Sequence, residues 1–251
     1  MTALTRPYWI EALFERREGW DEGVYPFNLP AVRSLHRLEF HPNVTFLVGE
    51  NGSGKSTLIE ALAVAWGFNA EGGTKNFSFA THQAHSALHQ FVRPVRSAIR
   101  ARDGFFLRAE SYFNVATEIE RLDQGGGGPP IINSYGGKSL HEQSHGESFF
   151  ALFENRFGGD GLYILDEPEA ALSPTRQLSF LAKMHELVQG RSQLIIATHS
   201  PILLGYPNAW IYQASEVGLD RVAYEDTDHY QVTRNFLTRR EMMLEVLLKE
   251  D

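Results

Sequence analysis

The residues with the clearest chemical meaning form a glycine-rich stretch whose spacing is Gly, four residues, then Gly-Lys-Ser. Glycines there let successive backbone N–H groups turn toward phosphate oxygens. The stretch consists of Gly49, Glu50, Asn51, Gly52, Ser53, Gly54, Lys55 and Ser56. We expect Lys55 to reach the β and γ phosphates of a nucleotide, Ser56 to bind Mg²⁺ and the Thr57 N–H to contact the α phosphate.

The elements predicted around this stretch suit the same chemistry. The run Val44–Val48 predicts a strand before it, and the spacing of Leu58, Leu62 and Ala65 predicts a helix over Lys55–Trp66. The positive end of that helix dipole would then face the phosphates. A chance glycine-rich turn would lack this strand-loop-helix context.

A second group of candidate residues follows the apolar run Leu162–Leu165, which predicts a buried strand of a parallel sheet. Asp166 and Glu167 come directly after it, so we expect both carboxylates at the carboxyl edge of the sheet, beside the phosphate-binding loop. Asp166 would bind Mg²⁺ directly or through water, and Glu167 would hold the attacking water as a general base. Without the loop, an exposed Asp-Glu-Pro turn would be the preferred interpretation.

Together these residues resemble the ABC-type ATPases, because residues 166–168 look like the extended Walker B motif of that class. Upstream, residues 143–147 read Gln-Ser-His-Gly-Glu where the family has its Leu-Ser-Gly-Gly-Gln signature. Ser144, Gly146 and Glu147 fit the signature, whereas a histidine replaces one glycine.

The resemblance extends to further segments of the chain. His199 follows a predicted strand and looks like the family's switch histidine, which holds the γ phosphate. Glu110 stands at the Q-loop position, where a carboxylate can touch Mg²⁺ through water, and Ser173 stands in the D-loop where the family usually has Asp. Residues 106–111 and 142–148 resemble a group of small stand-alone bacterial ATPases.

The resemblance implies a composite site. In ABC-type ATPases two ATP molecules are sandwiched head-to-tail in a twofold dimer, and the signature of one protomer caps the γ phosphate held by the other. Ser144, Gly146 and Glu147 would therefore complete the site of a second copy, with Glu167 as base and His199 on the γ phosphate. ATP and Mg²⁺ would be bound, and hydrolysis would open an ATP-dependent homodimer.

The alternation of strands and helices predicts an α/β fold: a P-loop NTPase of ABC ATPase type, with a largely parallel central sheet, flanking helices, an antiparallel edge and a helical insert. We expect residues 1–251 to form one domain, with the insert at approximately 75–157. One helix is expected over 82–99, bent at Pro94. Further strands are expected at 38–40, 105–109, 193–198 and 210–213, and further helices at 112–122, 147–156, 174–189 and 233–249.

Composition limits the remaining possibilities. The 251 residues carry 23 Lys and Arg against 31 Asp and Glu, a net charge of −8 that argues mildly against a protein whose main task is to bind nucleic acid. The absence of cysteine excludes disulfides and thiol catalysis. No apolar stretch approaches the roughly 20 residues that cross a bilayer, and we expect a cytoplasmic protein without direct membrane insertion.

Several weaker features leave alternatives open. His82, His85 and His89 have the spacing of one helix face, and an ordinary polar face is preferred over a metal site. Either Tyr25 or Phe27 is placed to stack on adenine, although core packing suits both.

Two further surfaces are undecided. The basic cluster of Arg93, Arg96, Arg100 and Arg102 would meet nucleic acid or a partner, or be ion-paired surface, which is the preferred interpretation. The helix over residues 236–248 would bury its apolar side chains in the core or in a dimer interface.

The sequence thus predicts Mg²⁺-dependent ATP binding and hydrolysis that acts as a motor or switch for an unknown protein or nucleic-acid partner, in DNA repair or defence. The alternative is the ATP-binding subunit of a transporter with a separate membrane permease. Against it, Glu110 replaces the Gln expected beside the coupling region, and the signature is atypical. A scaffold with negligible turnover is a third class, and the retained Glu167 argues against it.

Overall fold

The computed structural model describes residues 7–74, 86–110, 112–124, 132–133, 137 and 145–249. Its strands are β1 (Trp9–Phe14), β2 (Arg37–Glu39), β3 (Val44–Gly49), β4 (Val92–Arg96), β5 (Asp103–Arg108), β6 (Gly161–Asp166), β7 (Gln193–Ala197), β8 (Trp210–Ser215) and β9 (Gly218–Val222). Its α-helices are α1 (Pro30–Arg33), α2 (Lys55–Trp66), α3 (Tyr112–Gln124), α4 (His145–Asn155), α5 (Pro174–Gln189), α6 (Pro201–Leu204), α7 (Asp228–Thr238) and α8 (Arg240–Leu247).

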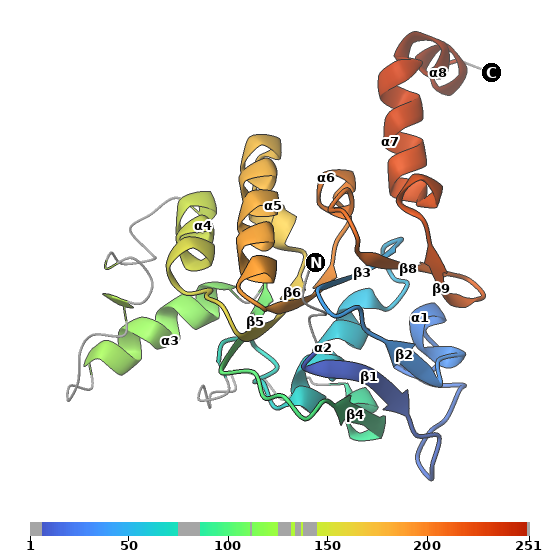
Figure 1. Ribbon diagram of the computed structural model, residues 1–251. Coiled ribbons are helices and arrows are strands. Elements are labelled where there is room, and N and C mark those ends of the chain that lie inside the picture. Colours follow the sequence, from blue (N-terminus) through green and yellow to red (C-terminus); the bar gives the residue numbers. More distant parts are fainter. Residues whose placement is uncertain are drawn as a thin grey trace, which may run out of the picture.

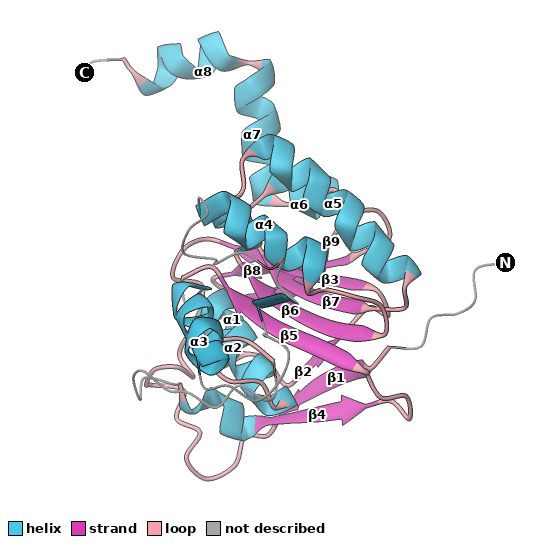
Figure 2. Cartoon of the chain, turned by 90° about the vertical axis from the view of Figure 1, so that its left-hand side faces the viewer, coloured by secondary structure: helices cyan, strands magenta, loops and turns pink. Residues whose placement is uncertain are grey.

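The strands form a six-stranded sheet in the order β5-β6-β7-β3-β8-β9 and a three-stranded sheet in the order β2-β1-β4. All pairs of the larger sheet are parallel except β8-β9, and both pairs of the smaller sheet are antiparallel. Helices α4 and α5 cover one face of the larger sheet, and α2 covers the other (Figure 1, Figure 2). The structure therefore confirms the predicted α/β fold with its largely parallel sheet and antiparallel edge.

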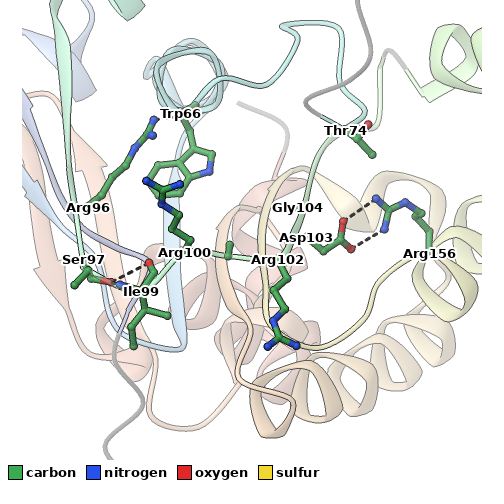
Figure 3. Close-up of a pocket in the computed structure, with 12 residues that line it drawn as sticks. Trp66, Thr74, Arg96, Ser97, Ile99, Arg100, Arg102, Asp103, Gly104 and Arg156 are labelled. Atoms are coloured by element: carbon green, nitrogen blue, oxygen red, sulfur yellow. Dashed lines mark hydrogen bonds and ion pairs between the residues drawn. The ribbon is translucent and has the colours of Figure 1, made fainter.

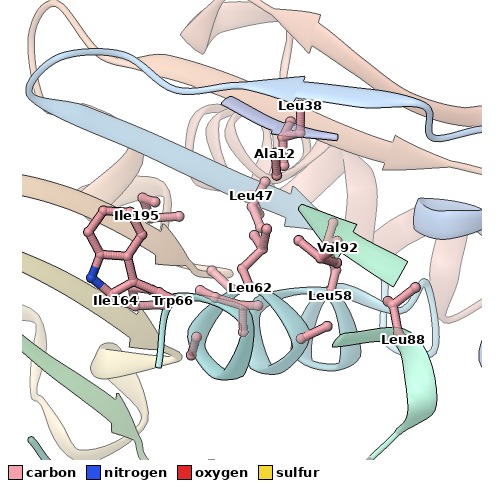
Figure 4. Packing of buried hydrophobic residues seen from close by; sticks show 14 of the residues in the cluster. Ala12, Leu38, Leu47, Leu58, Leu62, Trp66, Leu88, Val92, Ile164 and Ile195 are labelled. Atoms are coloured by element: carbon pink, nitrogen blue, oxygen red, sulfur yellow. The ribbon is translucent and has the colours of Figure 1, made fainter. Parts of the chain in front are cut away.

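Helix α2 is buried because it lies between the two sheets. Leu58 and Leu62 are fully buried, and they pack in one cluster with Leu47 of β3 and with Ala12 and Leu38 of the smaller sheet (Figure 4). The helix begins at Lys55 and ends before Gly67, as predicted. This packing fixes the position of the N-terminal end of α2, which carries the phosphate-binding loop.

A second core, rich in aromatic rings, lies on the other face of the larger sheet. Phe153 of α4 contacts Phe180 of α5 with ring centroids 4.3 Å apart, and Phe157 stacks on Tyr163 of β6 at 4.4 Å. Large rings bury much apolar area each, so these contacts tie α4 firmly to the sheet. They set the place of residues 145–147, the part of the signature segment with which α4 begins.

The helix predicted over residues 82–99 is wrong for residues 86–99, while residues 82–85 lie outside the described residues. A short 3₁₀ helix covers Ala87–Phe91, and the chain then forms β4, which pairs only with β1 at the edge of the smaller sheet. A proline is tolerated there because an edge strand leaves one row of N–H groups unused, so Pro94 marks a strand rather than a bent helix. Within the expected insert, β4 belongs to the smaller sheet and β5 to the larger one, and the described α-helices are α3 and α4.

The C-terminal segment also differs from the prediction. Instead of one helix over 233–249, α7 and α8 follow each other with a break at Arg239, and both project away from the sheets (Figure 1). Neither helix has a buried residue, and Val246 and Leu247 are 72% and 67% exposed. Packing into the core of this chain is therefore excluded for these side chains, and the interface alternative stays a prediction. Within the described ranges, no helix combines the length and apolar character needed to cross a bilayer.

Candidate functional site

Three neighbouring strands bring the candidate residues together. β6, β7 and β3 lie side by side and parallel, so their carboxyl ends share one edge of the sheet. β3 leads into the glycine-rich loop, β6 ends at Asp166 before Glu167, and β7 ends two residues before His199. Segments that are far apart in sequence thus meet at the edge where open α/β sheets bind their ligands.

The loop has the backbone shape of a phosphate cradle. Gly54 has φ +96°, and a Cβ atom there would lie 2.9 Å from the Leu29 Cβ, so a side chain is excluded. The buried Lys55 ammonium donates to the carbonyl oxygens of Gly49 at 2.7 Å and Glu50 at 3.0 Å. The buried Ser53 hydroxyl has no hydrogen-bond partner among the described residues. An unsatisfied donor beside a lysine that curls back onto the loop fits a bound phosphate.

The two predicted magnesium ligands are in contact. The Ser56 hydroxyl donates to Asp166 Oδ1 at 3.3 Å, and the Asp166 side chain is 6% exposed. Burial raises the pKa of Asp166 to about 7, and the neighbouring Glu167 adds to the rise, whereas Arg108 opposes it. Hydroxyl and carboxylate oxygens are the ligands that Mg²⁺ prefers, so this pair fits the expected ion. Burial also lowers the pKa of Lys55, and nearby carboxylates counteract this effect.

Arg108, at the end of β5, is a site residue that the sequence did not single out. Its guanidinium lies 3.6 Å from Asp166 Oδ2, 2.7 Å from Glu60 Oε2 and 3.4 Å from Glu110 Oε2. It therefore balances the charge of three carboxylates beside the magnesium ligands. Glu110 itself is 83% exposed, and it contacts Arg108 on this side of the site. The signal available in sequence was an arginine at the end of a predicted strand. Its place directly across from Asp166 comes from the pairing of β5 with β6.

Glu167 and His199 face each other. Glu167 has φ +52°, a conformation that non-glycine residues rarely adopt, and its N–H donates to the Ala197 carbonyl at 2.9 Å. His199 Nε2 lies 3.3 Å from Glu167 Oε1. Strained backbone of this kind is concentrated at functional sites, where the surrounding structure holds it in place.

Two partners of His199 escaped sequence reasoning. Glu169 is half-buried, desolvation raises its pKa, and its Oε1 accepts from the backbone N–H of His199 at 2.6 Å. His229, from the first turn of α7, places its Nε2 3.0 Å from His199 Nδ1. Neither position belongs to the motifs, and the contact with His229 spans 30 residues of sequence.

The signature segment is described in part. Ser144 lies outside the described residues, while Gly146 and Glu147 belong to the first turn of α4. Glu147 is exposed and lies 3.9 Å from Arg176 of α5. Ser173, in the D-loop, caps α5 by accepting from the Arg176 N–H at 3.4 Å. Serine and aspartate are both good helix caps, so Ser173 meets this local requirement without a carboxylate.

The structure separates the two candidates for adenine stacking. Tyr25 lines a cavity of about 260 Å³ with Asn51, Lys55 and Thr57, and its ring is largely exposed. Phe27 is 4% exposed and packs on Trp20 and Phe91 with centroids 4.7 and 5.1 Å away. Tyr25 therefore remains the candidate, and Phe27 belongs to the core.

The basic cluster lies elsewhere, around a cavity of about 820 Å³ next to Trp66 at the far end of α2 (Figure 3). Arg96 stacks on Trp66 at 4.3 Å, and Arg102 lies 3.8 Å from Asp160. Arg100 also lines this cavity, whereas Arg93 pairs with Glu15 at 2.9 Å. Most of the cluster is thus engaged within the chain, in line with the preferred interpretation.

The histidine series is described at one position. His82 and His85 lie outside the described residues, and His89 Nδ1 lies 2.9 Å from the Ser86 carbonyl of its own turn. Among the described residues, no group of three or more His, Cys, Asp or Glu side chains is placed to hold a metal ion.

Tyr25→Ala is expected to weaken binding of ADP about tenfold, because a lost aromatic stacking contact costs on the order of 1 kcal/mol. Tyr25→Phe keeps the ring and should bind as the wild type does. Isothermal titration calorimetry measures both; equal affinity of the alanine variant and the wild type would exclude Tyr25 from the adenine site.

In the absence of nucleotide and Mg²⁺, Asp166→Asn is expected to raise the melting temperature of the protein, by about 2–4 °C for each kcal/mol added to the free energy of unfolding. The folded-state pKa of Asp166 is about 7, above its ordinary value of 3.8, so the wild type loses stability as pH rises between these values. The gain from Asn should be smallest at pH 4 and reach its full size above pH 7. Thermal melts at pH 4, 6 and 8 check this, with the exposed Asp220→Asn as a control that should show no gain; a gain independent of pH would contradict the account.

Comparisons with known proteins agree with this geometry. Residues 25–133 match a family model described as "AAA domain", and residues 139–205 match one described as "AAA domain, putative AbiEii toxin, Type IV TA system". A search of curated proteins found no match.

Solved structures share the fold at low identity. The structure of cbiO1 from Clostridium perfringens, part of the ABC transporter complex cbiONQ, is 16% identical with a TM-score of 0.52, over 94% of this chain and 99% of that one. An SmcHead bound to the C-winged helix domain of ScpA is 13% identical with a TM-score of 0.51, over 86% and 98%. The two AAA-domain matches and the shared fold together support a P-loop ATPase of the ABC/AAA type.

Proposed function

We propose that this chain binds ATP with Mg²⁺ and hydrolyses it. The observation that carries the proposal is the meeting of Lys55, Ser56, Asp166, Glu167 and His199 at one edge of the sheet, around the glycine-rich loop. These residues supply a phosphate cradle, oxygen ligands for a hard cation, a carboxylate and an imidazole. That set is what phosphoryl transfer to water requires.

Each residue has a distinct role in the proposed reaction. Lys55 leaves the loop carbonyls and binds the β and γ phosphates, while the loop N–H groups from Gly49 to Thr57 hold phosphate oxygens. Ser56 and Asp166 would hold Mg²⁺, which would neutralise charge on the phosphates, and Glu110 would act on it through water. Glu167 takes the proton of the attacking water, and His199 holds the γ phosphate.

The site is proposed to be completed by a second copy of the chain. Glu147 is exposed, and with Ser144 and Gly146 it would lie at the N-terminal end of α4, where a helix dipole favours an anion. Residues 1–251 would act as one ATPase domain, and ATP would bridge the two copies. Loss of the γ phosphate would then release them, which makes the dimer a switch.

This switch could act on either of two kinds of partner. In the first, the chain acts on a protein or nucleic acid in repair or defence, a reading favoured by the second AAA model, whose description names a toxin system. In the second, it serves a separate permease, as the likeness in fold to cbiO1 allows. Stimulation of ATP turnover by DNA favours the first candidate, and stimulation by a co-purified membrane protein favours the second.

Lys55→Ala is expected to reduce ATP affinity at least a hundredfold and to abolish hydrolysis, because it removes the ammonium that faces the phosphates. Lys249→Ala changes an exposed lysine of the C-terminal segment and should behave as the wild type. Equilibrium dialysis with labelled ATP measures the affinity; micromolar binding by Lys55→Ala would show that the nucleotide site lies elsewhere.

Glu167→Gln is expected to bind ATP normally, to turn it over at least a hundredfold more slowly and to accumulate as a dimer. The amide keeps the size of the side chain and cannot accept the proton. Light scattering coupled to gel filtration, with ATP and with ADP, reports the mass. A monomer in both nucleotides would remove the argument for a composite site.

A further inference from the structure

The contact between His199 and His229 links the proposed γ-phosphate sensor to the C-terminal helices. His229 Nε2 lies 3.0 Å from His199 Nδ1, and the other nitrogen of His199 lies 3.3 Å from Glu167 Oε1. Among the described residues, His199 Nε2 has no hydrogen bond, so the nitrogen that faces Glu167 is left for another partner. The ring is therefore hydrogen-bonded through Nδ1, while its buried Nε2 beside Glu167 has no hydrogen bond within the described part of the chain.

The chemistry of the three groups sets the direction of hydrogen donation. A carboxylate only accepts, so the hydrogen of a neutral His199 belongs on Nε2, the nitrogen that faces Glu167. Nδ1 of His199 is then bare, and His229 must supply the hydrogen between the rings through its own Nε2. Burial lowers the pKa of both histidines, which favours this neutral pair.

His229 is itself held in place by the base of α7. The buried Thr227 caps the helix by accepting from the Tyr230 N–H at 3.3 Å. Asp228 bonds twice to Gln213 of β8, at 2.8 and 3.0 Å, through its carboxylate and its N–H. Because β8 pairs with β3, these hydrogen bonds connect the start of α7, and with it His229, to the strand that leads into the phosphate-binding loop.

We propose that His229 is a positioning residue for His199. Its Nε2–H bonds to Nδ1 of His199, fixes the tautomer and ring plane of that side chain, and presents Nε2–H toward Glu167, the side on which the γ phosphate is expected. The inference rests on the proposed ATPase function. It adds a residue outside the motifs and gives α7 a direct contact with the nucleotide site.

The matched variants are His229→Met and His229→Gln. Methionine has a similar length and no donor, whereas the Gln side-chain amide can place an N–H near the position of His Nε2. We expect His229→Met to lower kcat about tenfold with an unchanged Kd for ATP, the size of effect that one lost hydrogen bond allows. His229→Gln should restore kcat to within about twofold of the wild type.

A double-mutant cycle separates positioning from a structural role. In a His199→Ala background, His229→Met should change kcat no further, because the residue it positions is gone. Three results would overturn the proposal: wild-type kcat in His229→Met, an equal loss in the Gln and Met variants, or a full further loss in the His199→Ala background.

A test without nucleotide keeps the inference separate from the proposed function. Nitrogen NMR of the histidine rings should show a scalar coupling across the His229 Nε2–H···Nδ1 His199 bond, with His199 in the Nε2–H tautomer. His229→Met should abolish the coupling. If the wild type shows the coupling but does not hydrolyse ATP, the proposed ATPase is refuted and the hydrogen bond is retained. If the folded wild type shows no coupling, the His229 inference alone is refuted.

Discussion

The parallel pairing of β6, β7 and β3 is the constraint on which the site depends. At the same edge, β3 leads into the phosphate-binding loop, β6 ends at the acidic pair, and β7 ends two residues before His199. A parallel neighbour requires a crossover connection, so these elements are far apart in sequence and adjacent in space. Burial of α2 between the two sheets then holds the loop at a fixed height above that edge.

The same convergence concentrates negative charge. Asp166 is buried and Glu169 is half-buried, and Glu167 lies between them in sequence. Lys55 and Arg108 are the cations set against these carboxylates, and desolvation raises the pKa of Asp166 despite them. Without a bound cation, these carboxylates repel one another and destabilise the fold, and a bound cation removes that repulsion. Ligand binding and stability are therefore coupled, since whatever binds the folded state stabilises it.

Local signals predicted much of this arrangement. The limits of α2 and α5 follow from helical spacing between glycine or serine boundaries, and the ends of β6 and β7 follow from apolar runs that stop at polar residues. The residues of each helix and strand determine its type and its ends, and the strands are largely apolar because both faces of the sheet are buried. The motif residues lie at their ends, and the edge they share follows from strand order.

Other parts depend on partners distant in sequence. β4 is a strand because β1 pairs with it, which outweighs the local resemblance to a helix. Arg108 lies beside Asp166 because β5 pairs with β6. His229 reaches His199 because α7 packs against α6 and hydrogen-bonds to Gln213 of β8 through Asp228. The choice between Tyr25 and Phe27 required knowing which ring faces the cavity and which faces Trp20.

We propose that each ATP-hydrolysing site is built from residues of two copies of the chain. The most direct test is phosphate release by the purified wild type with saturating Mg²⁺ and ATP, measured over a wide range of protein concentration. A site shared between copies predicts that the rate per chain rises with concentration and reaches a plateau once the dimer dominates. A rate per chain that stays constant from nanomolar to micromolar protein, with a monomeric mass throughout, would contradict the account.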